Sequence, residues 1–197
     1  MHIDYYFATI SPFTYMVGTR LGELAARHGA TVTYKPVSIM DLFARTGGTA
    51  PKDRHPSRMA YRQQDMRRSA AKLGLPINLA PAHWPTNPAP SSYAIIAAAK
   101  DGAGDVDRLV ANITRACWAE EKDIAQDEVI ADALEAAGFD RALVNKGLMD
   151  GAETYARNLE EAVAAGVFGA PFFVVGEEKF WGQDSLADLD AYLAQAA

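Results

Sequence analysis

The segment 10–15, Ile-Ser-Pro-Phe-Thr-Tyr, constrains the fold most because two different patterns meet there. Residues 3–9 are rich in β-branched and aromatic side chains, which predicts a strand. Apolar side chains then recur at helical spacing, which predicts one helix that ends at Gly29. Ser11 is a favoured N-cap residue, and Pro12 suits the first helical position. We therefore expect a hydroxyl group where a strand meets helical N–H groups, a place that favours a bound anion.

A second strand is predicted at 31–37, where apolar and polar side chains alternate. Because Pro36 has no N–H group, this strand should end there or lie at a sheet edge. The order strand, helix, strand predicts two parallel strands joined by a right-handed crossover.

The middle of the chain is predicted to be helical, with no convincing strand. Residues 46–53 read as a loop, and 76–90 form a proline-rich passage. Helical patterns occupy 57–73, a segment through Lys100 that Ser91 or Ser92 would cap, 106–120, 127–137 and 140–149.

The last fifth of the chain returns to mixed structure. It predicts a helix at 153–165, a hairpin of strands 171–175 and 179–181, and a final helix capped by Asp184 or Ser185. Taken together, the two ends predict an α/β thioredoxin-like fold, with a mixed four-stranded sheet and helices on both faces. Residues 1–42 and 151–197 would form this domain, and residues 43–150 an inserted helical domain.

Composition limits the function classes. The 197 residues carry a net charge of −6 with a pI of about 5.2, which argues against non-specific nucleic-acid binding. No apolar run reaches the ~20 residues that a bilayer requires. The only cysteine, Cys117, excludes an internal disulfide, and the N-terminal residues lack a signal-peptide pattern, so we expect a cytoplasmic protein. The four histidines show no metal-ligand spacing, so we expect no metal.

The junction at Ser11 also limits the chemistry. Thiol oxidoreductases of this fold place Cys-x-x-Cys there, whereas this chain has Ser11 and Thr14 and so cannot exchange disulfides at that point. One interpretation is that Ser11 is simply a helix cap with no further role. The other is that its hydroxyl donates a hydrogen bond to the thiolate of a bound molecule.

Two C-terminal motifs favour the second interpretation. Pro171 opens a strand, and in this fold such a proline is cis, so that Ala170 presents its backbone to a peptide-like ligand. Asp184 could cap the last helix or pair with the ammonium of a ligand, while nearby N–H groups take its carboxylate. A γ-glutamyl group carries both charges.

These motifs resemble those of the 2-hydroxychromene-2-carboxylate isomerases, a family close to the kappa-class glutathione transferases. The shared patterns are Ser-Pro-Phe-x-Tyr at 11–15, Phe-Gly-Ala-Pro at 168–171 and Trp-Gly-Gln-Asp at 181–184. Weaker similarity at 47–48, 65–68, 74–76 and 118–124 extends the resemblance over nearly the whole chain.

The resemblance implies a glutathione-dependent isomerase that forms a homodimer. Ser11 would hold the glutathione sulfur as a thiolate, which would add to a conjugated substrate, allow rotation and leave. The glutathione site would consist of Ser11, Phe13, Ala170, Pro171, Trp181, Gly182, Gln183, Asp184 and Ser185.

The implied substrate is a small aromatic carboxylate. Arg54 and Arg58, in or beside the loop that should cover the site, would bind its carboxylate. Gly48, Trp84 and Asn87 would complete the substrate site. Many family members have Asn at the position of Gly48, Lys near Arg58 and Arg at Ser185, and these departures leave the aromatic substrate open.

Two alternatives also stay open at this point. The same thiolate would serve a kappa-like glutathione transferase or peroxidase. A protein of a different class, a thioredoxin-fold binding or chaperone-like protein without chemistry, would share the fold.

Overall fold

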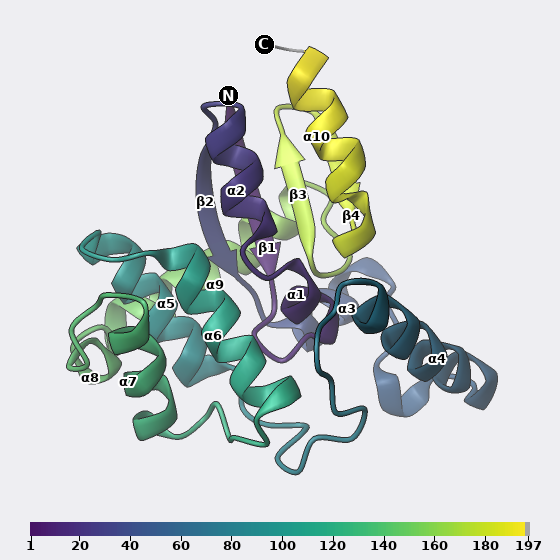
Figure 1. Cartoon of the computed structure of the whole chain (residues 1–197), viewed down its shortest axis with the longest axis horizontal. Coiled ribbons are helices and arrows are strands. Elements are labelled where there is room, and N and C mark those ends of the chain that lie inside the picture. The colour runs from purple at the N-terminus through teal and green to yellow at the C-terminus, as the bar shows by residue number, and fades with distance from the viewer. Residues whose placement is uncertain (196–197) are drawn as a thin grey trace.

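A four-stranded sheet forms the centre of the computed structural model, which describes residues 1–195 (Figure 1). Residues 196 and 197 of the predicted segment 151–197 lie outside the described residues. The strands are β1 (His2–Phe7), β2 (Thr31–Pro36), β3 (Phe172–Val175) and β4 (Glu178–Trp181). Their order is β2-β1-β3-β4, with β1 parallel to β2 and antiparallel to β3, and with β3 and β4 paired as a hairpin. The predicted mixed sheet is confirmed, and β2 both ends at Pro36 and lies at the edge.

Helices cover both faces of this sheet and form a separate group beside it (Figure 1). The α-helices are α1 (Pro12–Val17), α2 (Arg20–Arg27), α3 (Ile39–Thr46), α4 (Pro56–Lys72), α5 (Ala89–Asp101), α6 (Val106–Ala119), α7 (Asp127–Ala136), α8 (Leu143–Lys146), α9 (Leu148–Ala164) and α10 (Leu186–Gln195). Two short 3-10 helices, η1 (Pro51–Asp53) and η2 (Gln183–Ser185), precede α4 and α10.

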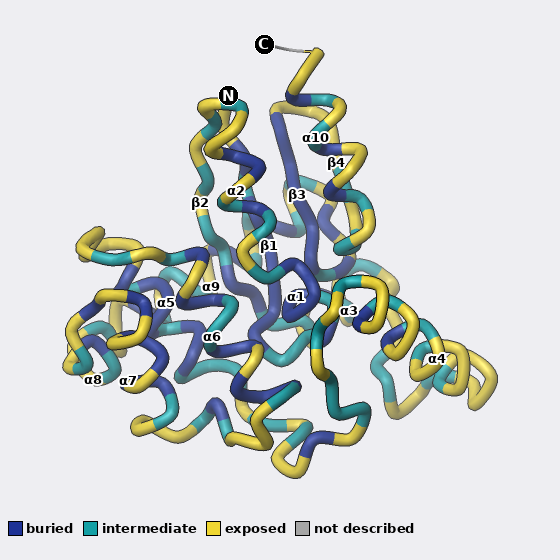
Figure 2. The backbone as a smooth tube through the Cα atoms, in the orientation of Figure 1, coloured by how far each residue is buried: buried dark blue, intermediate teal, exposed yellow. Residues whose placement is uncertain are grey.

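The apolar composition of β1 explains why helices pack on both sides of the sheet. Successive side chains of a strand point to opposite faces. Ile3, Tyr5 and Phe7 belong to one buried cluster with residues of α1, α2, α6 and α10. Tyr6 belongs to a second cluster with Leu42 of α3 and residues of α9. Figure 2 shows β1 and β3 as the most continuously buried strands, which fits their central positions.

Most of the inserted helices pack beside the sheet, while α4 extends away from it on the other side (Figure 1). α5 packs against α9, α6 and β2, and α1 packs against α6 and α4. Most of the surface of α4 is exposed (Figure 2). The proposed boundaries at 42/43 and 150/151 fall inside α3 and α9, so the division into two domains stays a prediction.

The single helix expected between Pro12 and Gly29 is wrong, because the chain breaks at Gly18 and Thr19. Gly18 has a φ of 55°, a left-handed value that glycine adopts readily, and its N–H group bonds back to the Tyr15 carbonyl. α2 then starts a new helix along the sheet. The apolar spacing continues across the break, so periodicity alone did not reveal it.

Other boundaries also differ from the predicted ones. α5 begins at Ala89, so Ser91 and Ser92 are not caps but lie buried inside its first turns, where both hydroxyls donate to the Pro88 carbonyl. α3 was not predicted, although Ser38 caps it. α9 begins five residues earlier than the pattern suggested, and α8 covers only four residues of the segment 140–149.

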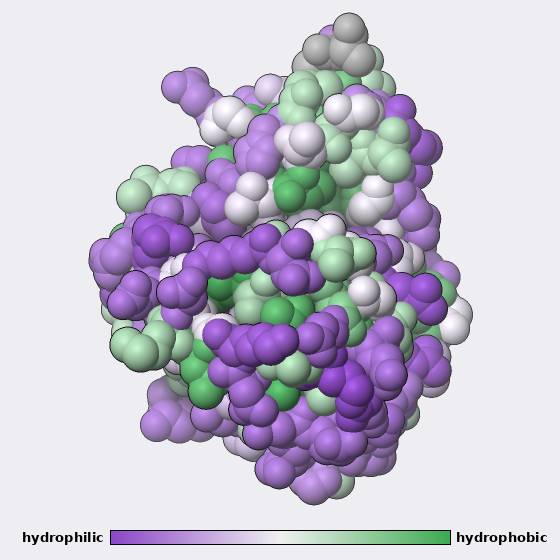
Figure 3. All heavy atoms as spheres, turned by 90° about the vertical axis from the view of Figure 1, so that its left-hand side faces the viewer, coloured by the Kyte–Doolittle hydropathy of each residue, from purple (hydrophilic) through white to green (hydrophobic). Residues whose placement is uncertain are grey.

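Hydrophilic side chains cover most of the face shown in Figure 3, with hydrophobic ones in patches between them. Across residues 1–195, no helix combines the length and the apolar character that crossing a bilayer requires.

Candidate active site

Ser11 lies at the predicted junction, directly after β1 and before α1. Its Oγ accepts a hydrogen bond from the Thr14 N–H group at 3.3 Å, and its extended backbone (φ −85°, ψ 126°) is that of an N-cap residue. Its own N–H group donates to the Ala8 carbonyl at 3.0 Å, which fixes the turn. The side chain is half-buried, so its hydroxyl proton stays available to a bound acceptor.

The β3–β4 hairpin brings the two C-terminal motifs together. The Ala170–Pro171 peptide bond is cis, as expected for this fold. Phe172 pairs with Trp181, and the Gly182 N–H group donates to the Pro171 carbonyl at 3.0 Å. The two motifs therefore share one end of the sheet.

The prediction that Asp184 or Ser185 caps α10 is wrong. Both residues lie in η2, which leads directly into α10, and the Ser185 hydroxyl donates to the Gly182 carbonyl at 2.8 Å. Gly182 has a φ of 95°, and a Cβ atom there would lie 2.6 Å from Asp184 Oδ1. Glycine is thus required for the turn that presents the exposed Asp184 carboxylate.

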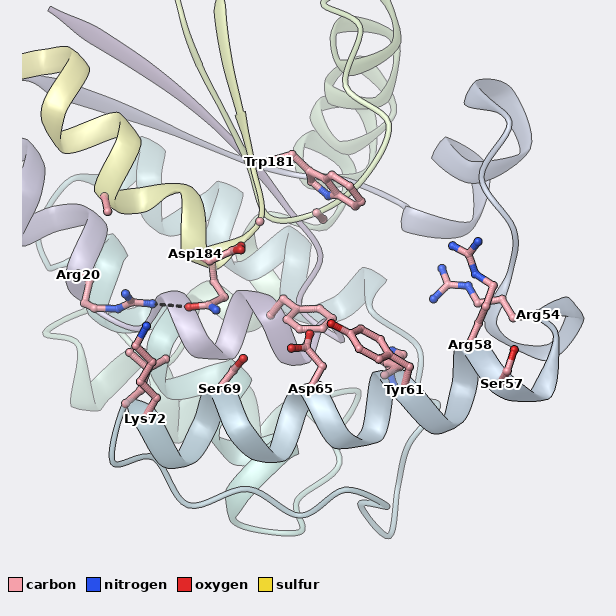
Figure 4. Close-up of a pocket in the computed structure, with 17 residues that line it drawn as sticks. Arg20, Arg54, Ser57, Arg58, Tyr61, Asp65, Ser69, Lys72, Trp181 and Asp184 are labelled. Atoms are coloured by element: carbon pink, nitrogen blue, oxygen red, sulfur yellow. Dashed lines mark hydrogen bonds between the residues drawn. The ribbon is translucent and has the colours of Figure 1, made fainter.

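A cleft of about 900 Å³ separates these motifs from α4 (Figure 4). Phe13 of α1, Ala170 and the segment 181–184 line one side, and α4 lines the other. The α4 residues are Ser57, Arg58, Tyr61, Arg62, Asp65, Ser69 and Lys72. Their spacing of three and four residues places them on one face of the helix.

The cleft is strongly basic in a chain whose net charge is −6. Its lining contains two carboxylates, Asp65 and Asp184, and five cations, Arg20, Arg54, Arg58, Arg62 and Lys72. Within residues 1–195, none of these five cations approaches a carboxylate to 4.0 Å, whereas most other basic residues are in ion pairs. Such a cleft suits a ligand with more than one negative charge.

Four of the five cations form two groups at opposite ends of the cleft, as Figure 4 shows. At one end lie Arg20 and Lys72, and Arg20 donates to the Gln183 side-chain oxygen at 3.0 Å. At the other end lie Arg54 and Arg58. Arg54 Nε donates to the Thr49 carbonyl at 2.8 Å, and its guanidinium lies 5.5 Å from the centre of the Phe43 ring. Asp184 and Trp181 lie between the two groups.

Burial lowers the pKa of the arginines Arg20, Arg54 and Arg62 below the usual value for an arginine. The positive charges of Arg58 and Arg54 lower the pKa of Arg54 and Arg62, respectively, still further. Arginine nevertheless remains protonated in proteins. A bound anion would reduce the electrostatic repulsion among these positively charged arginines.

Eight of the predicted site residues line the cleft: Phe13, Arg54, Arg58, Ala170, Trp181, Gly182, Gln183 and Asp184. Ser11, Pro171 and Ser185 are immediate or near neighbours of these residues in the chain but do not belong to the lining. The side chains of Trp84 and Asn87, and the exposed Gly48, also lie outside it.

The positions of these last three residues have separate structural causes. The Trp84 indole N–H group donates to the Ile10 carbonyl at 3.2 Å, and its ring centre lies 5.8 Å from that of Trp118. The exposed Asn87 accepts from the N–H group of Ala89 in a local turn. A side chain at Gly48 would collide with the Phe43 ring.

The cleft residues that the sequence interpretation missed are mostly on α4 and α2. They are Arg20, Ser57, Tyr61, Arg62, Asp65, Ser69, Lys72, Leu73 and Ala187. The polar spacing 58, 62, 65, 69 and 72 was a usable signal, because one helix face so rich in polar groups is typical of a wall facing a polar cleft. From the sequence alone, this face of α4 could not be distinguished from an ordinary solvent-exposed helix face, because both have the same polar spacing.

Cys117 is buried in α6, and burial raises the pKa of its thiol to about 12. It is therefore not a nucleophile at neutral pH. The described residues also contain no group of three His, Cys, Asp or Glu side chains that could bind a metal.

The sequence is similar over nearly its whole length to two proteins named 2-hydroxychromene-2-carboxylate isomerase. The 2-hydroxychromene-2-carboxylate isomerase of Sphingobium xenophagum is 28% identical over 194 residues, which is 97% of each chain. The protein of the same name from Pseudomonas putida is 30% identical over 200 residues, covering 99% of this chain and 95% of the relative. The resemblance inferred from the motifs is thereby confirmed.

Solved structures support the same fold. A 2-hydroxychromene-2-carboxylate isomerase structure aligns with a TM-score of 0.79 at 26% identity, covering 100% of this chain and 96% of the other. The cytosolic disulfide reductase DsbM from Pseudomonas aeruginosa aligns with a TM-score of 0.70 at 18% identity, over 100% of this chain and 98% of the other, and indicates the fold alone. The DSBA-like thioredoxin domain family matches residues 2–194. The chain therefore belongs to the DSBA-like thioredoxin domain family, and within it to the group that contains the 2-hydroxychromene-2-carboxylate isomerases.

Proposed function

We propose that the protein is a glutathione-dependent isomerase of 2-hydroxychromene-2-carboxylate or a related intermediate of aromatic degradation. Three curated relatives of this name, each matching at least 95% of the chain, support an isomerase. The observation that carries the proposal is the position of Ser11 at the β1–α1 junction beside a basic cleft, where its hydroxyl proton has no acceptor among the described residues.

The residues of the cleft fit glutathione. The γ-glutamyl group of the tripeptide carries a carboxylate and an ammonium, and the cleft has the cations Arg20 and Lys72 at one end and the Asp184 carboxylate between them and the other end. The fold neighbour DsbM has also been solved with GSH. Asp184 would bind the ammonium, Gly182 and Gln183 would flank the γ-glutamyl group, and Ala170 would offer its backbone to the cysteinyl residue.

Bound glutathione would supply the thiol nucleophile that adds to the conjugated double bond of the substrate and leaves after rotation. Ser11 would donate its hydroxyl proton to the negative sulfur, and so lower the pKa of the thiol. The N–H groups in the first turn of α1 would add to this stabilisation, although α1 has only six residues. Phe13, two residues after Ser11, would provide an apolar wall.

The substrate would approach from the end of the cleft that holds Arg54 and Arg58. A guanidinium binds a planar carboxylate through two parallel hydrogen bonds, so these residues suit an aromatic carboxylic acid. Gly48, Trp84 and Asn87 lie outside the cleft lining, and the proposed substrate contacts are therefore restricted to the arginines. A homodimer remains a prediction from the resemblance, and a cytoplasmic location remains a prediction from the single cysteine and the N-terminal residues.

Substitution of the Ser11 hydroxyl tests this proposal. Ser11→Ala should lower glutathione-dependent isomerisation of 2-hydroxychromene-2-carboxylate by about 100-fold, the effect of removing one donor to a reacting anion. The ultraviolet absorbance of the bound thiolate, followed against pH, should show a raised thiol pKa. Loss of the cap should cost only about 1 kcal/mol of stability.

Thr19→Ala is a matched control, because Thr19 is the N-cap residue of α2 and its hydroxyl bonds to Glu23 instead. Full glutathione-dependent turnover by Ser11→Ala would refute the assigned role. Turnover of a chloronitroaromatic electrophile without isomerisation would favour a glutathione transferase, and failure to bind glutathione in calorimetry would favour a binding protein without chemistry.

A further inference from the structure

Arg62 is one of three cations of the cleft, with Arg20 and Lys72, that neither the motifs nor the resemblance assigned. It lies near the middle of α4, one helical turn after Arg58, on the face that lines the cleft. The guanidinium is half-buried, and two aromatic rings lie against it.

The two rings connect Arg62 to the Ser11 junction. Its Cζ atom is 6.0 Å from the centre of the Phe13 ring and 5.8 Å from that of the Trp84 ring. Phe13 follows Ser11 by two residues, and Trp84 donates to the Ile10 carbonyl just before Ser11. The guanidinium is therefore held beside the turn that carries the proposed reacting centre.

Within residues 1–195, the positive charge of Arg62 has no ionic partner. Asp65, three residues later, is 3.7 Å from Arg68 instead, and no carboxylate lies within 4.0 Å of Arg62. Burial and the charge of Arg54 both lower its pKa. A half-buried cation without a counter-ion is costly in a folded protein unless a ligand neutralises it.

The other two arginines at this end of the cleft are less suited to a fixed role. Arg58 is exposed, and Arg54 uses its Nε–H group on the Thr49 carbonyl. The rings around Arg62 already restrict its side chain, so binding there would cost little further conformational entropy. Its planar N–H groups match the two oxygens of a carboxylate.

We infer that Arg62 is a specificity-determining residue that binds the carboxylate of a conjugated aromatic acid beside Ser11. The identity of the ligand rests on the proposed function. Arg54 and Arg58 would then attract the anion toward the cleft, and Arg62 would fix its orientation.

Calorimetry with trans-cinnamate and cinnamamide tests this inference. The two probes share shape and conjugation, and only the first carries a negative charge. The unmodified protein should bind cinnamate more tightly, and Arg62→Gln should weaken cinnamate binding by about 10- to 100-fold while cinnamamide changes by less than about twofold. Arg62→Lys keeps the charge but not the planar donors, so its affinity for cinnamate should lie between those of the unmodified protein and Arg62→Gln.

Arg67→Gln is the matched control, because Arg67 lies on the same helix, is exposed and does not line the cleft. It should leave the preference for cinnamate unchanged. Equal effects of both substitutions, equal binding of the two probes by the unmodified protein, or binding of neither would overturn the inference. The measurement is made without glutathione, so its outcome is independent of the Ser11→Ala test.

Discussion

Asp184 has an exposed carboxylate in a cleft where cations dominate. Within residues 1–195 it forms no ion pair, and the turn at Gly182 presents it beside Trp181. This charge would favour a zwitterionic ligand over a simple anion. A dianion without an ammonium group would be repelled by it.

Asp184→Asn should therefore weaken glutathione binding by about fivefold, the value of an exposed ion pair. N-acetylglutathione, which lacks the ammonium charge, should bind the unmodified protein more weakly and should lose nothing further on this substitution. Calorimetry with both ligands measures the difference. Asp188→Asn, on the first turn of α10, is the control for a lost surface charge. Equal loss for both ligands would show that Asp184 does not contact the ammonium.

Among the elements, the turn around Ser11 is held by the segment inserted between β2 and β3, namely by α5 and by the proline-rich stretch before it, as well as by the sheet. The Trp84 indole donates to the Ile10 carbonyl, and the buried Ser91 hydroxyl in α5 is hydrogen-bonded to the Thr9 hydroxyl at 3.0 Å. The Tyr15 hydroxyl donates to the Pro76 carbonyl at 2.6 Å. These contacts lead us to expect that the inserted segment positions the junction, with Trp84 acting as a positioning residue through its bond to Ile10.

Trp84→Phe should lower the free energy of unfolding by about 1–2 kcal/mol, because the Ile10 carbonyl loses its partner and the smaller ring leaves a gap. It should lower kcat for isomerisation more than it raises the KM for glutathione, since Ser11 shifts while the γ-glutamyl contacts stay in place. Urea unfolding and steady-state kinetics measure the two effects.

Trp118→Phe is the control for this prediction. Trp118 packs against Trp84, but in the described structure its own indole N–H group has no hydrogen-bond partner. The Trp118→Phe variant should have a lower free energy of unfolding because packing is lost, and its kcat should stay close to that of the unmodified protein. An equal fall in kcat for both variants would mean that the bond to Ile10 is irrelevant.

At the scale of the whole molecule, Asp107 joins the sheet to the inserted helices. This buried carboxylate of α6 accepts from the Tyr34 hydroxyl of β2 at 3.1 Å and from the Gly22 N–H group of α2 at 3.3 Å. Burial is the largest cause that raises its pKa, to about 6, and the charges of Asp105 and Glu23 act in the same direction. The ionised form is therefore disfavoured in the folded protein.

Stability should fall as the pH rises from about 4 to about 6, because over this range the folded protein binds more protons at Asp107 than the unfolded chain does. Asp107→Asn should remove this fall and raise the free energy of unfolding near pH 7 by about 1–3 kcal/mol. Urea unfolding of both proteins at several pH values measures this. An unchanged pH profile in the variant would contradict it.

The order of elements was predictable because each depends on local patterns. The β-branched and aromatic residues of β1, the alternation in β2, the Gly176 turn of the hairpin and the helical spacing of 57–73 identified the sheet and most of the helices. The break at Gly18 was not predictable, because the apolar spacing continues through it, and the start of α5 at Ala89 was not, because Ser91 and Ser92 resemble N-cap residues. The end of α1 depends on the left-handed conformation of Gly18, and the start of α5 depends on the burial of its two serines.

That a serine replaces the usual cysteine at the β1–α1 junction, and that Gly182 and Asp184 share one short motif, could be read from neighbouring residues. The position of α4 opposite these motifs could not, and it is this position that brings Arg20, Arg62 and Lys72 into one cleft and leaves Trp84 outside its lining. The reason is that the net charge of a cleft depends on side chains that are distant in sequence. Local sequence patterns do not predict which helix face packs opposite which turn.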